Sequence, residues 1–198
     1  MKLKANINAK GVYSASILNK ITKSAELFET IVNSAEFKDM IVNMPDKWRI
    51  GESSKYKNKS GLELYNHILS GKEERDTEID YEADIIVDEY RGKAWSKVVG
   101  FMSPRKPTIH INNRFYYSYG LERIVSNLLH EWLHTMGFRH YTSDPNTSFA
   151  YYANYIVKTL YPKLIEGEID LPKEEIYTQV CSRKWFRLWI KKCRWVKI

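Results

Sequence analysis

The chain has 198 residues, enough for one domain with a substantial core, and its 43% hydrophobic and 14% aromatic content argues against intrinsic disorder. It contains no run of about 20 apolar residues, which excludes a transmembrane helix, and its first residues lack the apolar segment of a secretory signal. We therefore expect a soluble protein that starts in the cytoplasm, with virion association or release by cell lysis left open.

The net charge of +7 is confined to the C-terminal end of the chain. Residues 178–198 hold seven basic side chains and no acidic one, whereas the rest of the chain holds 24 of each sign. Half of the six tryptophans also lie in this segment. We therefore divide the chain into a domain at 1–177 and a basic aromatic tail at 178–198. The tail either binds an anionic surface or an assembly partner, or packs its tryptophans on the domain while its lysines stay in solvent.

The two cysteines of the chain, Cys181 and Cys193, both lie in the tail. Disulfides are rare in proteins that stay in the reducing cytoplasm, so we expect both thiols to be reduced. A disulfide between the two remains an alternative.

The N-terminal part of the chain is predicted to be one strand followed by helices. Residues 2–8 fit a first strand, ended by Gly11. Apolar residues spaced three and four apart then predict a helix that starts at Ser14 or Ser16 and extends to Ile31.

Capping signals mark the next two helices. Ser34 is placed to cap a short helix that stops near Pro45, and residues 51–60 are polar and predicted to be a loop. Ser60 and Glu63 have the spacing of a capping box, which predicts a further helix directly after the loop.

The middle of the chain is predicted to form strands. Residues 72–84 are rich in acidic side chains and are expected to be exposed. Strands are predicted at 83–90, 94–101 and 107–113, separated by turn signals. The last strand alternates apolar and polar residues.

A long amphipathic helix follows these strands. From Leu121 to Met136 the apolar residues share one broad face, while His130 and His134 fall on another stripe, which predicts that the histidines face a cleft. The apolar and aromatic content of the segment from Ala150 to Leu160 predicts a closing helix. Because proline breaks helices, this helix is expected to end at Pro162.

The end of the amphipathic helix carries the sequence HEWLHTMGFRH, which fits the pattern H-E-x-x-H-x-x-G-x-x-H. His130 and His134 are four residues apart, so on a helix both can bind one metal ion. Glu131 can reach a water at the metal rather than the metal itself. Gly137 permits a backbone turn with positive φ that brings His140 back as a third ligand. Three neutral imidazoles leave one position of a tetrahedral Zn²⁺ open, as in catalytic sites. A structural or catalytically inactive zinc site is the alternative.

This string resembles the extended motif of the metzincin clan of zinc endopeptidases. The resemblance implies zinc ligation by His130, His134 and His140 and a general-base role for Glu131. It also implies an α/β (α+β) fold: a small mixed sheet backed by a long active-site helix, with N-terminal helices and a short C-terminal subdomain. In this clan the strand before the helix is an antiparallel edge that binds substrate, which suggests residues 107–113 as the rim of the cleft.

The chain departs from the clan's pattern after the motif, because no methionine lies downstream of His140 to form the expected Met-turn. Residues 146–152 resemble that turn, with Ala150 in the place of the methionine and Tyr152 closing it. Small divergent bacterial and phage members are the closest likeness. Tyr151 or Tyr152 then either stabilises the oxyanion of the reaction or packs in the core.

The sequence thus predicts a zinc metallopeptidase that hydrolyses protein or peptide substrates through a zinc-activated water, with Glu131 as base. One alternative is a catalytically silent zinc-binding structural module, such as a phage-particle protein, that uses the tail as its contact surface. Another is a binder of nucleic acid or a membrane surface that carries zinc. An intact Glu131 favours the enzyme, since a purely structural site needs no acid there.

Overall fold

The computed structural model describes most of the chain up to residue 167 and a hairpin near the C-terminus. The residues described are 2–76, 78–93, 95–103, 108–141, 144, 147–167, 177–183 and 191–197. Within them, no helix is both long enough and apolar enough to cross a membrane. The tryptophans at positions 185 and 189, on which the packing alternative for the tail depends, lie outside the described residues.

A four-stranded mixed sheet forms one layer of the domain. Its strands are β1 (Lys4–Gly11), β2 (Glu82–Tyr90), β3 (Gly100–Met102) and β4 (Thr108–Asn112), in the spatial order β1-β2-β4-β3. The pairs β1–β2 and β2–β4 are parallel, and β3 pairs antiparallel with β4. The antiparallel edge of the sheet is therefore β3, and the prediction that residues 107–113 form this edge is wrong.

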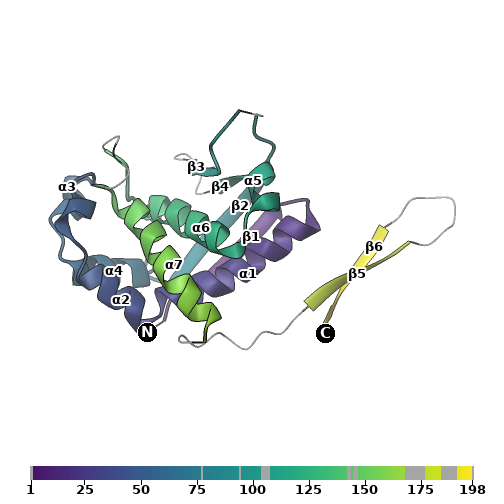
Figure 1. Ribbon diagram of the computed structural model, residues 1–198, viewed down its shortest axis with the longest axis horizontal. Helices are drawn as coiled ribbons and strands as arrows, with labels where there is room; N and C mark the ends of the chain where they lie inside the picture. Colours follow the sequence, from purple (N-terminus) through teal and green to yellow (C-terminus); the bar gives the residue numbers. More distant parts are fainter. Residues whose placement is uncertain are drawn as a thin grey trace.

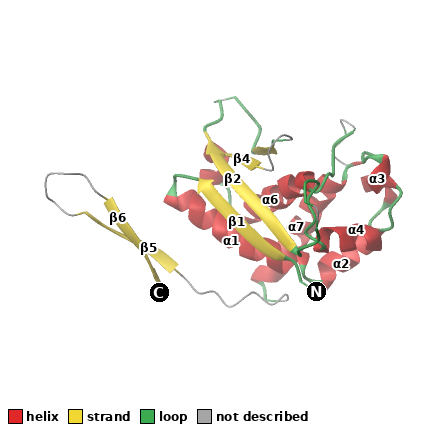
Figure 2. Cartoon of the chain, turned by 180° about the vertical axis from the view of Figure 1, so that it is seen from behind, coloured by secondary structure: helices red, strands yellow, loops and turns green. Residues whose placement is uncertain are grey.

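Helices form the second layer, on one face of the sheet (Figures 1 and 2). They are α1 (Ala15–Val32), α2 (Ala35–Val42), the 3₁₀ helix η1 (Asp46–Arg49), α3 (Ser54–Lys57), α4 (Gly61–Leu69), α5 (Asn113–Ser118), α6 (Leu121–Thr135) and α7 (Phe149–Ile165). This arrangement confirms the predicted mixed fold, with a long helix behind a small mixed sheet.

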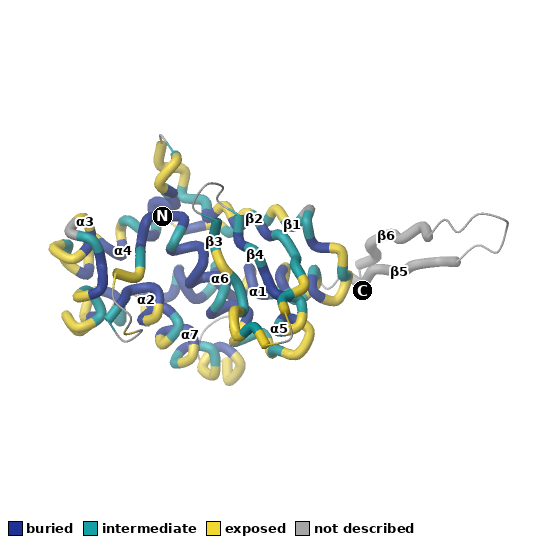
Figure 3. The backbone as a smooth tube through the Cα atoms, turned by 90° about the horizontal axis from the view of Figure 1, so that it is seen from above, coloured by how far each residue is buried: buried dark blue, intermediate teal, exposed yellow. Residues whose placement is uncertain are grey.

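The core lies between the sheet and α6, which runs through the middle of the domain and is largely buried (Figure 3). In β2 the side chains of Ala83, Ile85 and Val87 point into this core, whereas Asp84 is exposed on the opposite face. Trp132 of α6 is fully buried and its ring meets that of Phe28 edge-on at 5.3 Å. Because aromatic side chains bury the largest apolar areas, this contact anchors α6 against α1.

Local capping signals were predicted correctly. Ser34 accepts a hydrogen bond from the backbone N–H of Phe37 at the start of α2. Ser60 and Glu63 form a reciprocal capping box at the start of α4. These contacts involve residues three apart in sequence, so the pattern alone identifies them.

Three local predictions are wrong, the first two of them because of contacts between residues distant in sequence. The polar segment 51–60 contains α3 and buries Tyr56 and Glu52, because it packs against the loop that follows α6. The acidic segment 72–84 is not wholly exposed, since Glu73 is only 5% exposed and accepts a hydrogen bond from the indole N–H of Trp132. The strand predicted at 94–101 begins only at residue 100.

Pro162 does not end the last helix of the domain, contrary to the prediction. Helix α7 continues to Ile165, and the backbone N–H of Glu166 still donates to the carbonyl of Pro162 at 2.9 Å. Proline removes only its own N–H from the helix ladder, and near the C-terminus the remaining bonds maintain the last turn.

The C-terminal hairpin is formed by β5 (Tyr177–Arg183) and β6 (Lys191–Lys197), which pair antiparallel. The register places Cys181 opposite Cys193.

Candidate metal centre

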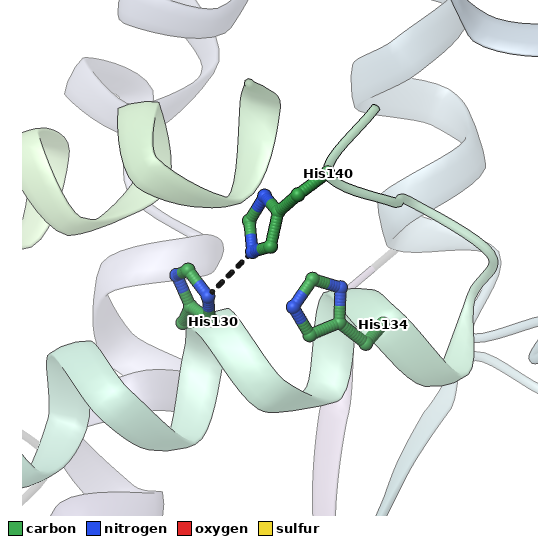
Figure 4. A group of neighbouring side chains, drawn as sticks. All are labelled: His130, His134 and His140. Atoms are coloured by element: carbon green, nitrogen blue, oxygen red, sulfur yellow. Dashed lines mark hydrogen bonds between the residues drawn. The ribbon is translucent and has the colours of Figure 1, made fainter. Parts of the chain in front are cut away.

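Helix α6 positions the first two candidate ligands one turn apart. Its apolar face is buried against the core, and His130 and His134 project from another stripe of the helix toward His140. The two rings lie 4.9 Å apart between centroids and are nearly perpendicular. The i, i+4 spacing of a helix thus produces the predicted pair (Figure 4).

The chain leaves α6 through a Schellman turn that redirects it toward the cleft. The N–H of Phe138 donates to the carbonyl of Leu133, and the N–H of Gly137 donates to that of His134, both at 3.1 Å. Gly137 has φ +97°, and a β-carbon there would lie 2.5 Å from a carboxylate oxygen of Glu74. The glycine of the motif is therefore required by both the backbone conformation and the available space.

His140 returns from this turn to face the two helical histidines, as Figure 4 shows. Its Nε2 lies 3.1 Å from Nε2 of His130, and one nitrogen of each of the three rings lies within 4.8 Å of those of the others. The predicted triad is therefore brought together, and it can hold a metal ion.

Each ring is oriented by a hydrogen bond at its other nitrogen, Nδ1. Nδ1 of His130 lies 3.1 Å from the carbonyl oxygen of Ala150, and Nδ1 of His134 lies 2.7 Å from the carbonyl oxygen of Phe138. Nδ1 of His140 lies 2.8 Å from the hydroxyl of Ser148. Such partners fix the orientation of histidine rings in metal sites.

These hydrogen bonds determine which nitrogens are available. A carbonyl oxygen can only accept, so Nδ1 of His134 carries the hydrogen, which leaves its Nε2 with a free lone pair in the neutral ring. Nδ1 of His130 lies between the carbonyl of Ala150 and the side-chain amide of Asn154, 3.2 Å away, and this pair of contacts is compatible with either tautomer. Burial lowers the pKa of His130 to about 3 and that of His134 to about 4, and burial also lowers the pKa of His140. All three rings are thus neutral near pH 7, the form in which imidazole binds metals.

Glu131 directly follows His130 on α6 and is only 5% exposed. Burial raises its pKa to about 7, although hydrogen bonds from the side chain of Asn127 and the backbone of Met102 act in the opposite direction. The amide of Asn127 donates to Oε1 of Glu131 at 3.3 Å, and its oxygen accepts from the hydroxyl of Tyr116 at 2.9 Å. The carboxyl is thus oriented by α6 and β3 and has a proton affinity suited to neutral pH.

The two tyrosines at the start of α7 have different surroundings. The ring centroid of Tyr151 lies 4.8 Å from those of both His130 and His140, and the residue is 38% exposed. Tyr152 is 4% exposed, donates its hydroxyl to the carbonyl of Met40 at 2.9 Å and packs against Trp48. Tyr152 is therefore a core residue, and only Tyr151 lies beside the triad.

A cavity opens next to His134. It lies between the end of β3, at Met102 and Ser103, and the acidic segment 73–76. Arg139 also lines it and forms an ion pair with Glu74, with 2.6 Å between nitrogen and oxygen. One ligand of the triad, His134, thus borders a cavity that is lined by several charged groups.

The groups that orient the triad could not be predicted from the sequence. The carbonyls of Phe138 and Ala150 carry no side-chain signal, and Asn127 is an ordinary polar residue of a helix. Ser148 offered a weak signal, since serine often precedes a helix, but its hydroxyl contacts His140 and makes no capping hydrogen bond.

Comparisons with known proteins add no relative: no family model, no curated protein and no solved structure matches the chain.

Proposed function

We propose that this protein is a zinc-dependent endopeptidase in which His130, His134 and His140 bind the ion and Glu131 is the general base. The observation that carries the proposal is the convergence of three neutral, oriented imidazoles, with a buried carboxyl directly after His130 in the sequence. Nitrogen ligands favour zinc over magnesium or calcium, which bind oxygen. Three protein ligands leave a fourth position for water or substrate.

The chemistry divides between the metal and Glu131. When bound, zinc would polarise the scissile carbonyl and lower the pKa of a water to about 7. Glu131 accepts a proton from the attacking water and then donates it to the leaving amine. Its raised pKa supports this role, because a carboxyl that titrates near pH 7 can both accept and release a proton there.

Strand β3 is the proposed binding site for the peptide backbone. It is the edge of the sheet, and Phe101 in its centre is 45% exposed. An edge strand has unpaired backbone groups that an extended peptide can bind by strand addition. The hydrogen bond between the backbone of Met102 and Glu131 links this edge to the proposed base. Tyr151, beside the triad, is the proposed donor to the oxyanion.

The test is hydrolysis of a casein-type protein and a broad peptide library by zinc-loaded protein. We expect Glu131→Gln to retain one zinc per chain and to lose about 10²–10⁴-fold in turnover, because it removes proton transfer but no ligand. Glu122→Gln, on the first turn of the same helix, is the matched control and is expected to stay active. Zinc binding without hydrolysis of any substrate by the wild type would instead support the silent structural module.

A further inference from the structure

Two residues of the segment 51–60, Gly51 and Glu52, contact both arms of the loop that carries His140. The carbonyl of Gly51 accepts from the N–H of Tyr141 at 3.0 Å, and its N–H donates to the carbonyl of Thr147 at 2.7 Å. One contact lies directly after His140 and the other lies just before α7. The loop is therefore fixed at both of its ends by a distant part of the chain.

The carboxylate of Glu52 makes a second pair of contacts to the same two arms. Its Oε2 accepts from the N–H of Arg139 at 3.1 Å, and its Oε1 accepts from the N–H of Phe149 at 2.9 Å. Glu52 is 6% exposed, and burial raises its pKa to about 7 although both backbone hydrogen bonds lower it. A buried carboxyl is costly unless its oxygens are paired, and here each oxygen has one N–H partner.

The bond to Phe149 satisfies a helix N–H that the capping residue itself does not reach. Phe149 is the first residue of α7, and the first N–H groups of a helix have no partner within the helix. Ser148 is the N-cap residue, whose side chain normally accepts from the N–H of the second or third helical residue, but Ser148 makes no such bond. Glu52 supplies an acceptor for the N–H of Phe149, and its negative charge suits the positive end of the helix dipole.

The hydroxyl of Ser148 lies instead 2.8 Å from Nδ1 of His140. We propose that Glu52 is a positioning residue for the third metal ligand: its carboxylate binds the residue before His140 and the residue after Ser148, and so holds the two side chains in the geometry in which Ser148 orients His140. The inference rests on the proposed metal site but not on peptidase activity. It predicts that substitutions of Glu52 and of Ser148 both lower metal affinity by disturbing the orientation of the His140 ring.

The experiment measures zinc affinity by competition with a chromogenic chelator, using the full chain. Glu52→Gln keeps the side-chain volume but can accept with only one atom, and we expect about 10–100-fold weaker zinc binding, as for other groups that support a ligand. Ser148→Ala is expected to weaken binding in the same range. In the double variant the second change should add little, because both remove the same orientation of His140.

Glu89→Gln is the matched control. Glu89 also accepts from two backbone N–H groups at the start of a helix, those of Tyr13 and Ser14 beside α1, but it joins elements that hold none of the three histidines. Zinc affinity of this variant should stay within about twofold of the wild type, below the range for a supporting group. Glu52→Asp, which keeps the charge but shortens the reach to the two N–H groups, replaces Glu52→Gln if that variant does not fold.

The outcomes separate this inference from the metal proposal. If the wild type binds no zinc, both fail. If the wild type and Glu89→Gln bind zinc but Glu52→Gln or Glu52→Asp binds it equally well, only the positioning role fails. Independent, multiplying losses from Glu52→Gln and Ser148→Ala would also overturn it, since they would indicate separate structural effects.

Discussion

The helical pair His130 and His134 and the loop residue His140 reach the same point by different means. The pair is placed by one helix, whose buried face fixes the direction of the opposite stripe. His140 is placed by a glycine turn, by Ser148 and by the contacts of the loop with Glu52. A local periodicity therefore sets two ligands, whereas contacts between residues far apart in sequence set the third. We expect changes to these two parts of the site to have different consequences.

The largest expected effect is the loss of a ligand. His134→Asn should lower zinc affinity by more than about 100-fold, beyond the range for losing a supporting group. His140→Asn should also lose high affinity but keep weak binding, because the helix still presents His130 and His134 at the correct spacing. Chelator competition measures both constants. Tight binding by either variant would show that the ion is held elsewhere.

The next largest effect is expected from a substitution in the turn that connects α6 to the loop with His140. Gly137→Ala should lower the free energy of unfolding by about 1–2 kcal/mol, because a residue with a β-carbon is strained at positive φ. Zinc affinity should fall as well, since the turn directs His140. Gly120→Ser is the control: no atom lies within 4 Å of its added β-carbon, and serine suits the start of α6. Equal urea midpoints for the two variants would contradict this account of the turn.

The acid stability of the metal-free protein tests the burial of the helical pair. The pKa of His134 is about 4 in the folded protein, against 6.5 ordinarily, so between these values the unfolded chain binds a proton that the folded one does not. The contribution of this ring to the free energy of unfolding therefore decreases as the pH is lowered from 6.5 toward 4. The decrease is up to about 1.4 kcal/mol per pH unit. The raised pKa of Glu131, about 7, acts in the opposite direction between 4.5 and 7.

Because the two contributions oppose each other, the difference between the wild type and His134→Asn isolates the imidazole. In urea unfolding from pH 6 to pH 4.5, the wild type should lose stability more steeply than the variant. Parallel curves would indicate that His134 is accessible to protons in the folded state.

The smallest expected effect on the site comes from the C-terminal tail. Deleting residues 178–198 should leave zinc affinity unchanged, since the described ligands and their partners all lie before residue 178. If the seven basic residues of 178–198 bind an anionic surface, full-length protein should bind heparin or anionic vesicles less tightly as salt rises, and the truncated protein should not bind. A large drop in melting temperature on truncation, without salt-dependent binding, would favour tail packing on the domain.

The sequence predicts the parts of the site that follow from local geometry. The spacing of His130 and His134 and the glycine at 137 correspond to a helix and its Schellman turn, both short-range structures. Glu52 contacts Arg139 and Phe149 across 87 and 97 residues of sequence. The polar segment that contains Glu52 has no sequence pattern from which these contacts could be predicted.

In the fold, too, the features that depend on neighbours in sequence were predictable, whereas those that depend on distant contacts were not. The amphipathic helices and their caps were predicted because they depend on neighbours in sequence. The edge position of β3 was not, because the order β1-β2-β4-β3 depends on how the chain crosses over between strands. Likewise, Tyr151 and Tyr152 are equivalent in sequence, and only the direction of α7 places one at the triad and the other in the core.

The most direct test of the central claim is a crystal structure of the zinc-loaded protein with anomalous scattering data collected at the zinc absorption edge. We expect one strong anomalous peak roughly 2.0–2.1 Å from Nε2 of His130, His134 and His140, with each Nδ1 still bound to its present partner. A peak elsewhere, ligation through Nδ1, or no peak at the triad at saturating zinc would contradict it.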